Sequence, residues 1–252
     1  MKPMTCCNKT FSIVWWTLTA LLIAGGVALV LFYTPEEATM GLIQKVFYLH
    51  LPSAISTFLA SLICFIASIG YMVQRQSKWD DLAAAGAKVS VFFCTIVLGT
   101  GMIWGHAAWG QWWTWSPRLT FSLVLWFLYV VYLMLHSSIE ASQRRAIICA
   151  VYGIIAFLDV PLVYLSVRLM PDIHPQSVTL APEMKWTLAL CFIPILMLAV
   201  GLLVGDYANR QKQREALHTA MTDTTPQTSP VEECRQGAEG QGGDAEEHGG
   251  QR

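Results

Sequence analysis

Six apolar stretches, each long enough to cross a membrane as a helix, constrain this chain more than any other feature. A helix rises about 1.5 Å per residue, so about 20 apolar residues cross the roughly 30 Å hydrocarbon core of a bilayer. We expect the spans at residues 11–33, 46–73, 89–104, 119–135, 146–167 and 186–204. Charged residues make up 13% of the chain, about half their share in a typical soluble domain. The sequence therefore predicts an all-α polytopic integral membrane protein with six transmembrane helices.

The lysines and arginines between the spans predict the orientation of the chain. Ten lie in segments on one side, namely Lys2, Lys9, Arg75, Lys78, Lys88, Arg144, Arg145, Arg210, Lys212 and Arg214. Four lie on the other side, namely Lys45, Arg118, Arg168 and Lys185. Segments that face the cytoplasm carry the excess of positive residues. Both termini are therefore expected in the cytoplasm, and the loop between the third and fourth spans is expected outside.

The chain divides into three regions by composition. We expect a cytoplasmic N-terminus at residues 1–10, a six-helix membrane domain at 11–210 and a cytoplasmic tail at 211–252. From about Glu215 the chain is polar and rich in Gly, Gln, Glu and Thr, which is typical of disordered segments. The tail is therefore predicted to be disordered and is assigned no chemistry.

Tryptophan is concentrated in the loop at residues 104–120, WGHAAWGQWWTWSPRLT, which holds five of the ten tryptophans in the chain. If residues 105–115 are helical, three indole rings share one face, namely those of Trp109, Trp112 and Trp113. Trp115 would lie off that face. An aromatic belt at the membrane interface accounts for one or two tryptophans. Five indicate a platform for a flat, apolar, partly charged ligand, and a porphyrin fits that description.

The end of this loop predicts the start of the next helix. Ser116 is a typical N-cap, and Pro117 suits the first helical position. Arg118 then falls in the first turn, where the helix dipole disfavours a cation unless an anion lies nearby. A ligand carboxylate would supply that anion. The alternative is that Arg118 reaches lipid phosphates.

Two histidines lie on the same side of the membrane as the tryptophans. His50 lies at the outer end of the second span, just before Pro52, and His174 lies in the loop between the fifth and sixth spans. Neutral imidazoles ligate haem iron, and two from opposite sides give a six-coordinate iron. Solvated interfacial histidines are the alternative. We expect His106 to be at most a third contact and His136 to face lipid headgroups or the cytoplasm.

These residues resemble a known family signature. Its pattern is approximately WGxWWxWDxRLT, from the CcmC family of haem-handling proteins in bacterial cytochrome c maturation. The matching residues are Trp109, Gly110, Trp112, Trp113, Trp115, Arg118, Leu119 and Thr120. Ser116 departs from the pattern, which has Asp there, and so removes a negative charge beside the ligand site. His50, in YLHLPSA, resembles the family segment YLHxPxA, and His174 matches its second outer-loop histidine.

The resemblance implies a function. His50 and His174 would be the axial ligands of a transiently bound haem b, while Trp109, Trp112, Trp113, Trp115 and Arg118 would hold the macrocycle and its carboxylates. The protein would present haem to the periplasmic haem chaperone CcmE, with the small membrane protein CcmD and the ABC-type subunits CcmA and CcmB as partners. The location implied is the bacterial inner membrane.

We expect this chain not to be an enzyme and not to bind nucleic acid. It has no GxxxxGK[ST] motif, so ATP hydrolysis would have to come from a partner. It also has no CxxC or CxxCH motif, which argues against a thiol-disulfide carrier and against covalently attached haem. No nucleophile or acid/base set appears in the outer loops.

Asp159 is the acidic residue deep in a predicted span, two residues before Pro161. Intramembrane carboxylates are costly and often functional. The simpler interpretation is a protonated or hydrogen-bonded side chain at a proline kink. Tyr164 and Arg168, one and two turns further out, are within reach of a bound ligand.

Three other functions are compatible with parts of the sequence. A transporter or permease would fit the six spans, but it leaves the tryptophans unexplained. A quinol-oxidising cytochrome b-like subunit would also pair histidines, although usually within the spans. The related CcsA-like cytochrome c synthetases share a tryptophan signature, but the RLT ending and the short chain favour CcmC.

Overall fold

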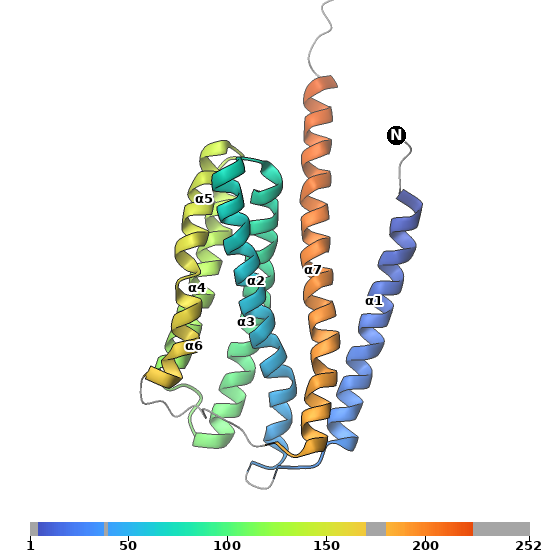
Figure 1. Cartoon of the computed structure of the whole chain (residues 1–252), viewed down its shortest axis with the longest axis vertical. Coiled ribbons are helices and arrows are strands. Elements are labelled where there is room, and N and C mark those ends of the chain that lie inside the picture. Colours follow the sequence, from blue (N-terminus) through green and yellow to red (C-terminus); the bar gives the residue numbers. More distant parts are fainter. Residues whose placement is uncertain (1–4, 38–39, 170–179, 224–252) are drawn as a thin grey trace, which may run out of the picture. The chain divides into compact units, whose positions relative to one another are not determined.

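The computed structural model describes residues 5–37, 40–169 and 180–223, and the regular elements in these ranges are helices (Figure 1). They are α1 (Thr5–Ala28), the π-helical η1 (Leu29–Tyr33), the 3-10 helix η2 (Leu42–Val46), α2 (Phe47–Gln74), α3 (Ser77–Trp109), α4 (Pro117–Ser138), α5 (Gln143–Ala156), α6 (Asp159–Leu169) and α7 (Pro182–Asp223). Six helical stretches in the described part are long and apolar enough to span a membrane. The prediction of an all-α polytopic membrane protein is therefore confirmed.

Two helices are longer than hydropathy predicts. The third span, expected at residues 89–104, is helical from Ser77 to Trp109. Its first part is rich in alanine, which favours a helix, but Lys78, Asp80, Asp81 and Lys88 lower the hydropathy of this stretch. At the other end of the chain, α7 continues to Asp223 and is helical in a stretch predicted to be disordered. The rest of the predicted tail, 224–252, lies outside the described residues.

The structure divides into two units after Gln211, at Met1–Gln211 and Lys212–Arg252. The described part of the second unit is the polar end of α7, up to Asp223. The first unit holds five of the spans, the sixth as far as Gln211, and the cavity described below.

Small side chains bring α2 and α3 close together. Ala67 of α2 and Ala84 of α3 are fully buried in a common core cluster. A Cβ atom on Gly86 would lie 2.9 Å from both the carbonyl oxygen of Ala60 and the amide nitrogen of Cys64. Only a glycine allows this approach of the two backbones, which is a usual way to pack helices inside a membrane.

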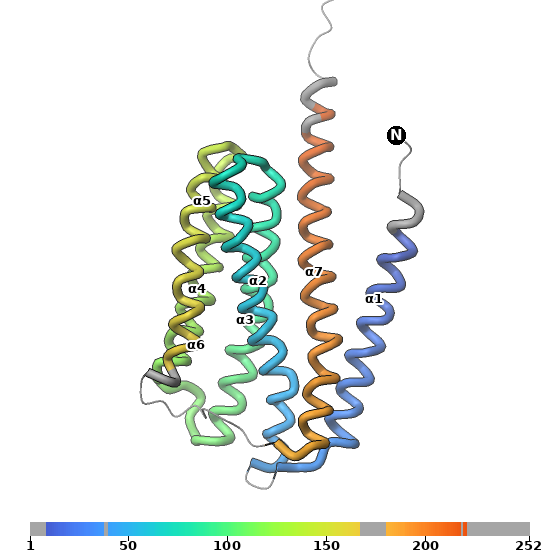
Figure 2. The backbone as a smooth tube through the Cα atoms, in the orientation of Figure 1, coloured from blue at the N-terminus to red at the C-terminus, as the bar shows by residue number. Residues whose placement is uncertain are grey.

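The fifth span is broken into two helices that follow each other along α4 (Figure 2). The break lies at Phe157 and Leu158, and Pro161 follows in the first turn of α6. Proline has no N–H to donate to the carbonyl four residues earlier, so a continuous helix is disfavoured here. Asp159 begins α6 and is 6% exposed. Its Oδ2 atom has no hydrogen-bond partner among the described residues.

Helix α7 packs against α1 and also against α2 and α3. A Cβ atom on Gly201 would lie 2.7 Å from the indole nitrogen of Trp15, so glycine makes room for that ring. Ile195 packs with Ala60 and Phe93 in a second core cluster. These contacts hold the first part of α7 beside the helices that line the cavity.

The described helix ends that flank the predicted outer loops lie at one end of the bundle. The starts of α2, α4 and α7 and the ends of α3 and α6 lie at this end (Figure 1). The residues singled out in the second, third and fourth spans are therefore neighbours in space.

Candidate functional site

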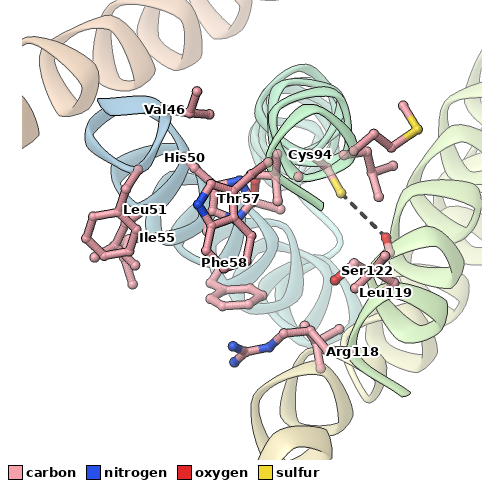
Figure 3. A pocket seen from close by; sticks show the side chains of 18 of the residues that line it. Val46, His50, Leu51, Ile55, Thr57, Phe58, Cys94, Arg118, Leu119 and Ser122 are labelled. Atoms are coloured by element: carbon pink, nitrogen blue, oxygen red, sulfur yellow. Dashed lines mark hydrogen bonds between the residues drawn. The ribbon is translucent and has the colours of Figure 1, made fainter. Parts of the chain in front are cut away.

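A cavity of about 480 Å³ opens at this end of the bundle, within the volume range of small-molecule sites. Most of its wall is apolar and comes from α2, α3, α4 and α6. Its polar and ionisable side chains are those of Gln44, His50, Thr57, Cys94, Arg118, Ser122 and Tyr164. Figure 3 shows His50 and Arg118 entering the cavity from different helices. An apolar cavity with one imidazole and one guanidinium suits an apolar ligand that carries a negative charge.

His50 lies in the first turns of α2 and is hydrogen-bonded to α3. Its Nδ1 atom lies 2.9 Å from the hydroxyl oxygen of Thr100. Its ring also lies over Gly101, where a Cβ atom would be 3.4 Å from Cε1. Two consecutive residues of α3 thus fix the imidazole at the cavity wall.

The tryptophan loop is not helical beyond Trp109. Gly110 has φ 72° and donates its N–H to the carbonyl of His106 at 2.9 Å, which is a glycine cap of the left-handed kind. Residues 111–116 are irregular. The prediction that Trp109, Trp112 and Trp113 share a helical face is therefore wrong, because Gly110 ends the helix directly after Trp109.

The irregular segment divides the tryptophans between the cavity and the surface. Trp104, Trp109 and Trp113 line the cavity, and the rings of the first two meet edge to face with centroids 5.2 Å apart. Trp112 is 59% exposed and Trp115 is 76% exposed. Neither is among the cavity-lining residues of the described chain. The structure thus brings two of the four expected tryptophans, Trp109 and Trp113, to the cavity.

Trp104 lines the cavity but was not among the expected ligand contacts. Trp104 is the first of the five clustered tryptophans, and membership of that cluster is the sequence feature that could have predicted its place in the cavity wall. Tyr164 of α6, expected within reach of a ligand, is also in the wall. Phe58 of α2 lines the cavity too, and an isolated phenylalanine in a span gives no signal in the sequence.

The start of α4 lies where the sequence predicts it. Ser116 is the N-cap residue with extended backbone, Pro117 is the first helical residue, and Arg118 in the first turn lines the cavity. The Ser116 hydroxyl, however, makes no capping hydrogen bond. The indole N–H of Trp113 is buried without a hydrogen-bond partner among the described residues. Buried donors are nearly always paired, so this N–H is available to a ligand acceptor.

The other histidines are placed differently. His106 stacks on Trp112, with ring centroids 4.1 Å apart and an interplanar angle of 4°. His136 does not face headgroups or the cytoplasm as expected, because its Nε2 atom lies 3.3 Å from the buried carboxylate of Asp80. His174 lies outside the described residues, and the side chain of Arg168 is not described either.

Comparison with known proteins identifies relatives along most of the chain. The family described as Heme exporter protein C (CcmC) matches residues 2–222. The protein of that name from Escherichia coli (strain K12) is 30% identical over 213 residues, which are 80% of this chain and 86% of the relative.

Two further relatives carry the same name. The one from Paracoccus denitrificans is 33% identical over 132 residues, 51% of this chain and 55% of the relative. The one from Rhodobacter capsulatus is 33% identical over 145 residues, 56% of this chain and 60% of the relative. The chain thus spans somewhat over half the length of these two relatives. Because the family matches residues 2–222 and the Escherichia coli relative is 30% identical over 213 residues, the chain belongs to the heme exporter protein C (CcmC) family.

Proposed function

We propose that this protein handles haem for cytochrome c maturation, binding it in the cavity at the outer end of the bundle. The observation that carries the proposal is the composition of that cavity. An apolar and aromatic wall surrounds one imidazole, His50, and one guanidinium, Arg118. Haem needs these three things, because it has an apolar macrocycle, an iron that imidazole ligates, and carboxylates that arginine binds.

His50 is the proposed ligand from within the bundle. Its ring is held by Thr100 and Gly101 at the cavity wall. We propose His174, which lies between α6 and α7 in the sequence, as the second axial ligand. Two imidazoles on opposite faces would make the bound iron six-coordinate and low-spin.

The tryptophans are proposed to hold two parts of the macrocycle, the part inside the cavity and the part that protrudes from it. Trp109 and Trp113 line the cavity and can contact the enclosed part of the ring. Trp112 and Trp115 are exposed and can cover the part that protrudes. Edge-to-face and offset-stacked aromatic contacts contribute roughly 0.5–1.5 kcal/mol each beyond the burial of area.

The carboxylates of haem are proposed to lie at the start of α4. Arg118 and the unpartnered indole N–H of Trp113 are both in the cavity wall there. The N-terminus of a helix adds a partial positive charge. The serine at position 116 leaves this region without the carboxylate of the family signature, which favours an anionic ligand further.

Haem is cargo in this proposal and not a resident cofactor. We propose that haem b is bound transiently and passed to a periplasmic chaperone of the CcmE kind. The assembly would include CcmD-like and CcmA/CcmB-like subunits in the bacterial inner membrane, with both termini of this chain in the cytoplasm. The protein itself would catalyse no reaction.

An absorption titration with haem tests the proposal. The full chain in mild detergent is compared with His50→Ala, His174→Ala and the control His106→Phe, which keeps a flat ring against Trp112. We expect a low-spin spectrum for the wild type and the control, and conversion to high-spin or loss of haem in the two alanine variants. A wild type that takes up no haem, or a spectrum unchanged in both alanine variants, would contradict the proposal.

A further inference from the structure

The hydroxyl of Thr100 has two kinds of neighbour. Its oxygen lies 2.6 Å from the carbonyl oxygen of Ile96 and 3.2 Å from that of Val97, one turn earlier in α3. It also lies 2.9 Å from Nδ1 of His50 in α2. This hydroxyl is therefore a direct link between the backbone of α3 and the imidazole at the cavity wall.

The count of hydrogens favours one direction for this link. A carbonyl oxygen has no hydrogen to donate, so the short contact between Thr100 and Ile96 requires the single hydroxyl hydrogen of Thr100. The hydroxyl oxygen can then only accept from His50. In this direction of the link, Nδ1 of His50 carries the hydrogen, and in the neutral ring Nε2 carries the lone pair.

This arrangement is what a metal-ligating histidine requires. Such a histidine usually donates its second ring N–H to a neighbouring acceptor, which fixes the tautomer and the ring orientation and raises the basicity of the ligating nitrogen. Here the acceptor belongs to a neighbouring helix and is itself held by the backbone of α3. The opposite tautomer would place two acceptors against each other, because Nδ1 would carry no hydrogen and the hydroxyl hydrogen of Thr100 is donated to Ile96.

We propose that Thr100 is the positioning residue for His50, holding it as the Nδ1–H tautomer so that Nε2 is the nitrogen that ligates haem iron. This inference rests on the proposed function, because it assigns a second residue to the same ligand. It adds a testable property of the protein in the absence of haem, namely which ring nitrogen is protonated.

The chain offers a matched control five residues earlier in the same helix. Thr95 donates its hydroxyl to the carbonyl of Val91 at 2.8 Å and accepts the indole N–H of Trp126 at 2.9 Å. Like the hydroxyl of Thr100, it therefore links a backbone carbonyl of α3 to a ring nitrogen on a neighbouring helix. Thr95 does not line the cavity. Thr95→Val therefore removes an equivalent hydroxyl without touching the proposed site.

The first experiment uses haem-free protein. Nitrogen NMR of histidine-labelled full chain in detergent reports the protonation of each ring nitrogen of His50, assigned with His50→Ala. We expect the Nδ1–H form in the wild type, in Thr100→Ser and in Thr95→Val, and loss of that preference in Thr100→Val. A wild-type ring protonated on Nε2, or a preference unchanged in Thr100→Val, would overturn the proposal.

The second experiment measures haem affinity and the absorption spectrum of the same variants. We expect about 10-fold weaker binding in Thr100→Val, the low end of the effect of such partners, and near wild-type binding in Thr100→Ser and Thr95→Val. If Thr100→Val does not fold, Thr100→Ala takes its place.

The outcomes separate the two proposals. Wild-type protein that binds haem through His50, with Thr100→Val binding equally well, overturns the role of Thr100 alone. Wild-type protein that binds no haem overturns the proposed function, and with it the role of Thr100 in positioning a haem ligand.

Discussion

Asp80, in the first turn of α3, and Arg145, in the first turn of α5, form an ion pair with a nitrogen–oxygen distance of 2.9 Å. Asp80 is 5% exposed at its side chain and Arg145 is 17% exposed. His136 of α4 lies against the same carboxylate oxygen at 3.3 Å. One buried carboxylate therefore joins three helices at the end of the bundle opposite the cavity.

Removing this carboxylate should destabilise the protein strongly. In Asp80→Ala the guanidinium of Arg145 stays buried without its partner, and breaking a buried pair in this way typically costs about 3–5 kcal/mol. The measurement is the free energy of unfolding in a denaturing-detergent titration. The control is Lys88→Ala, because the pair of Lys88 with Asp206 leaves the lysine 60% exposed. A more exposed pair contributes about 1 kcal/mol or less. Equal losses in the two variants would contradict the structural role of Asp80.

The approach of α2 and α3 at Gly86 predicts a steric effect. Gly86→Ala would place a methyl group 2.9 Å from two backbone atoms of α2, and overpacking of this kind costs about 1–3 kcal/mol. Gly99→Ala, in the same helix, is the control, because a Cβ atom there meets nothing within 4 Å. We expect thermal unfolding at a lower temperature only for Gly86→Ala. If both variants unfold like the wild type, the two helices are not in this contact.

The indole N–H of Trp113 predicts a difference between two neighbouring tryptophans. Trp113→Phe keeps an aromatic ring in the cavity wall but removes a buried donor that has no partner among the described residues. Hydrogen bonds to charged groups contribute about 1.5–3 kcal/mol, so haem affinity should fall about 10-fold or more. Trp112→Phe, at an exposed position, should have a smaller effect. Equal losses of haem affinity in Trp113→Phe and Trp112→Phe would contradict a specific role for the indole N–H of Trp113.

Arg118 predicts a dependence on the carboxylates of the ligand. Arg118→Gln should weaken the binding of haem by about 10-fold, since a charge-assisted hydrogen bond is lost. The same variant should bind haem dimethyl ester as well as the wild type does, because the ester has no carboxylate. A loss of affinity for both ligands would show that Arg118 supports the fold of the cavity and not the recognition of the anion.

The sequence predicts the membrane spans well, because apolar length is nearly all that a spanning helix requires. It predicts their ends poorly where the helix does not depend on apolar residues. Ala84 and Ala87 are fully buried against neighbouring helices, yet the charged residues on either side of them lower the hydropathy of this stretch. The start of α3 at Ser77 was therefore not predictable from apolar content. The break between α5 and α6, in contrast, follows directly from Pro161.

The cavity could be predicted in part. His50, Trp109, Trp113 and Arg118 are all in its wall. The positions of Trp112 and Trp115 depend on the irregular segment after Gly110, and the helical spacing rule does not apply there. Thr100 gives no signal in the sequence, because a threonine in a span usually bonds only to its own helix. Its contact with His50 depends on the packing of α2 against α3.

The most direct measurement of the central claim is a cryo-electron microscopy structure of the haem-loaded protein. We predict haem in the cavity at the outer end of the bundle, with iron bound to Nε2 of His50 and a carboxylate near Arg118 and the indole N–H of Trp113. Haem bound elsewhere, or iron without a bond to His50, would contradict it.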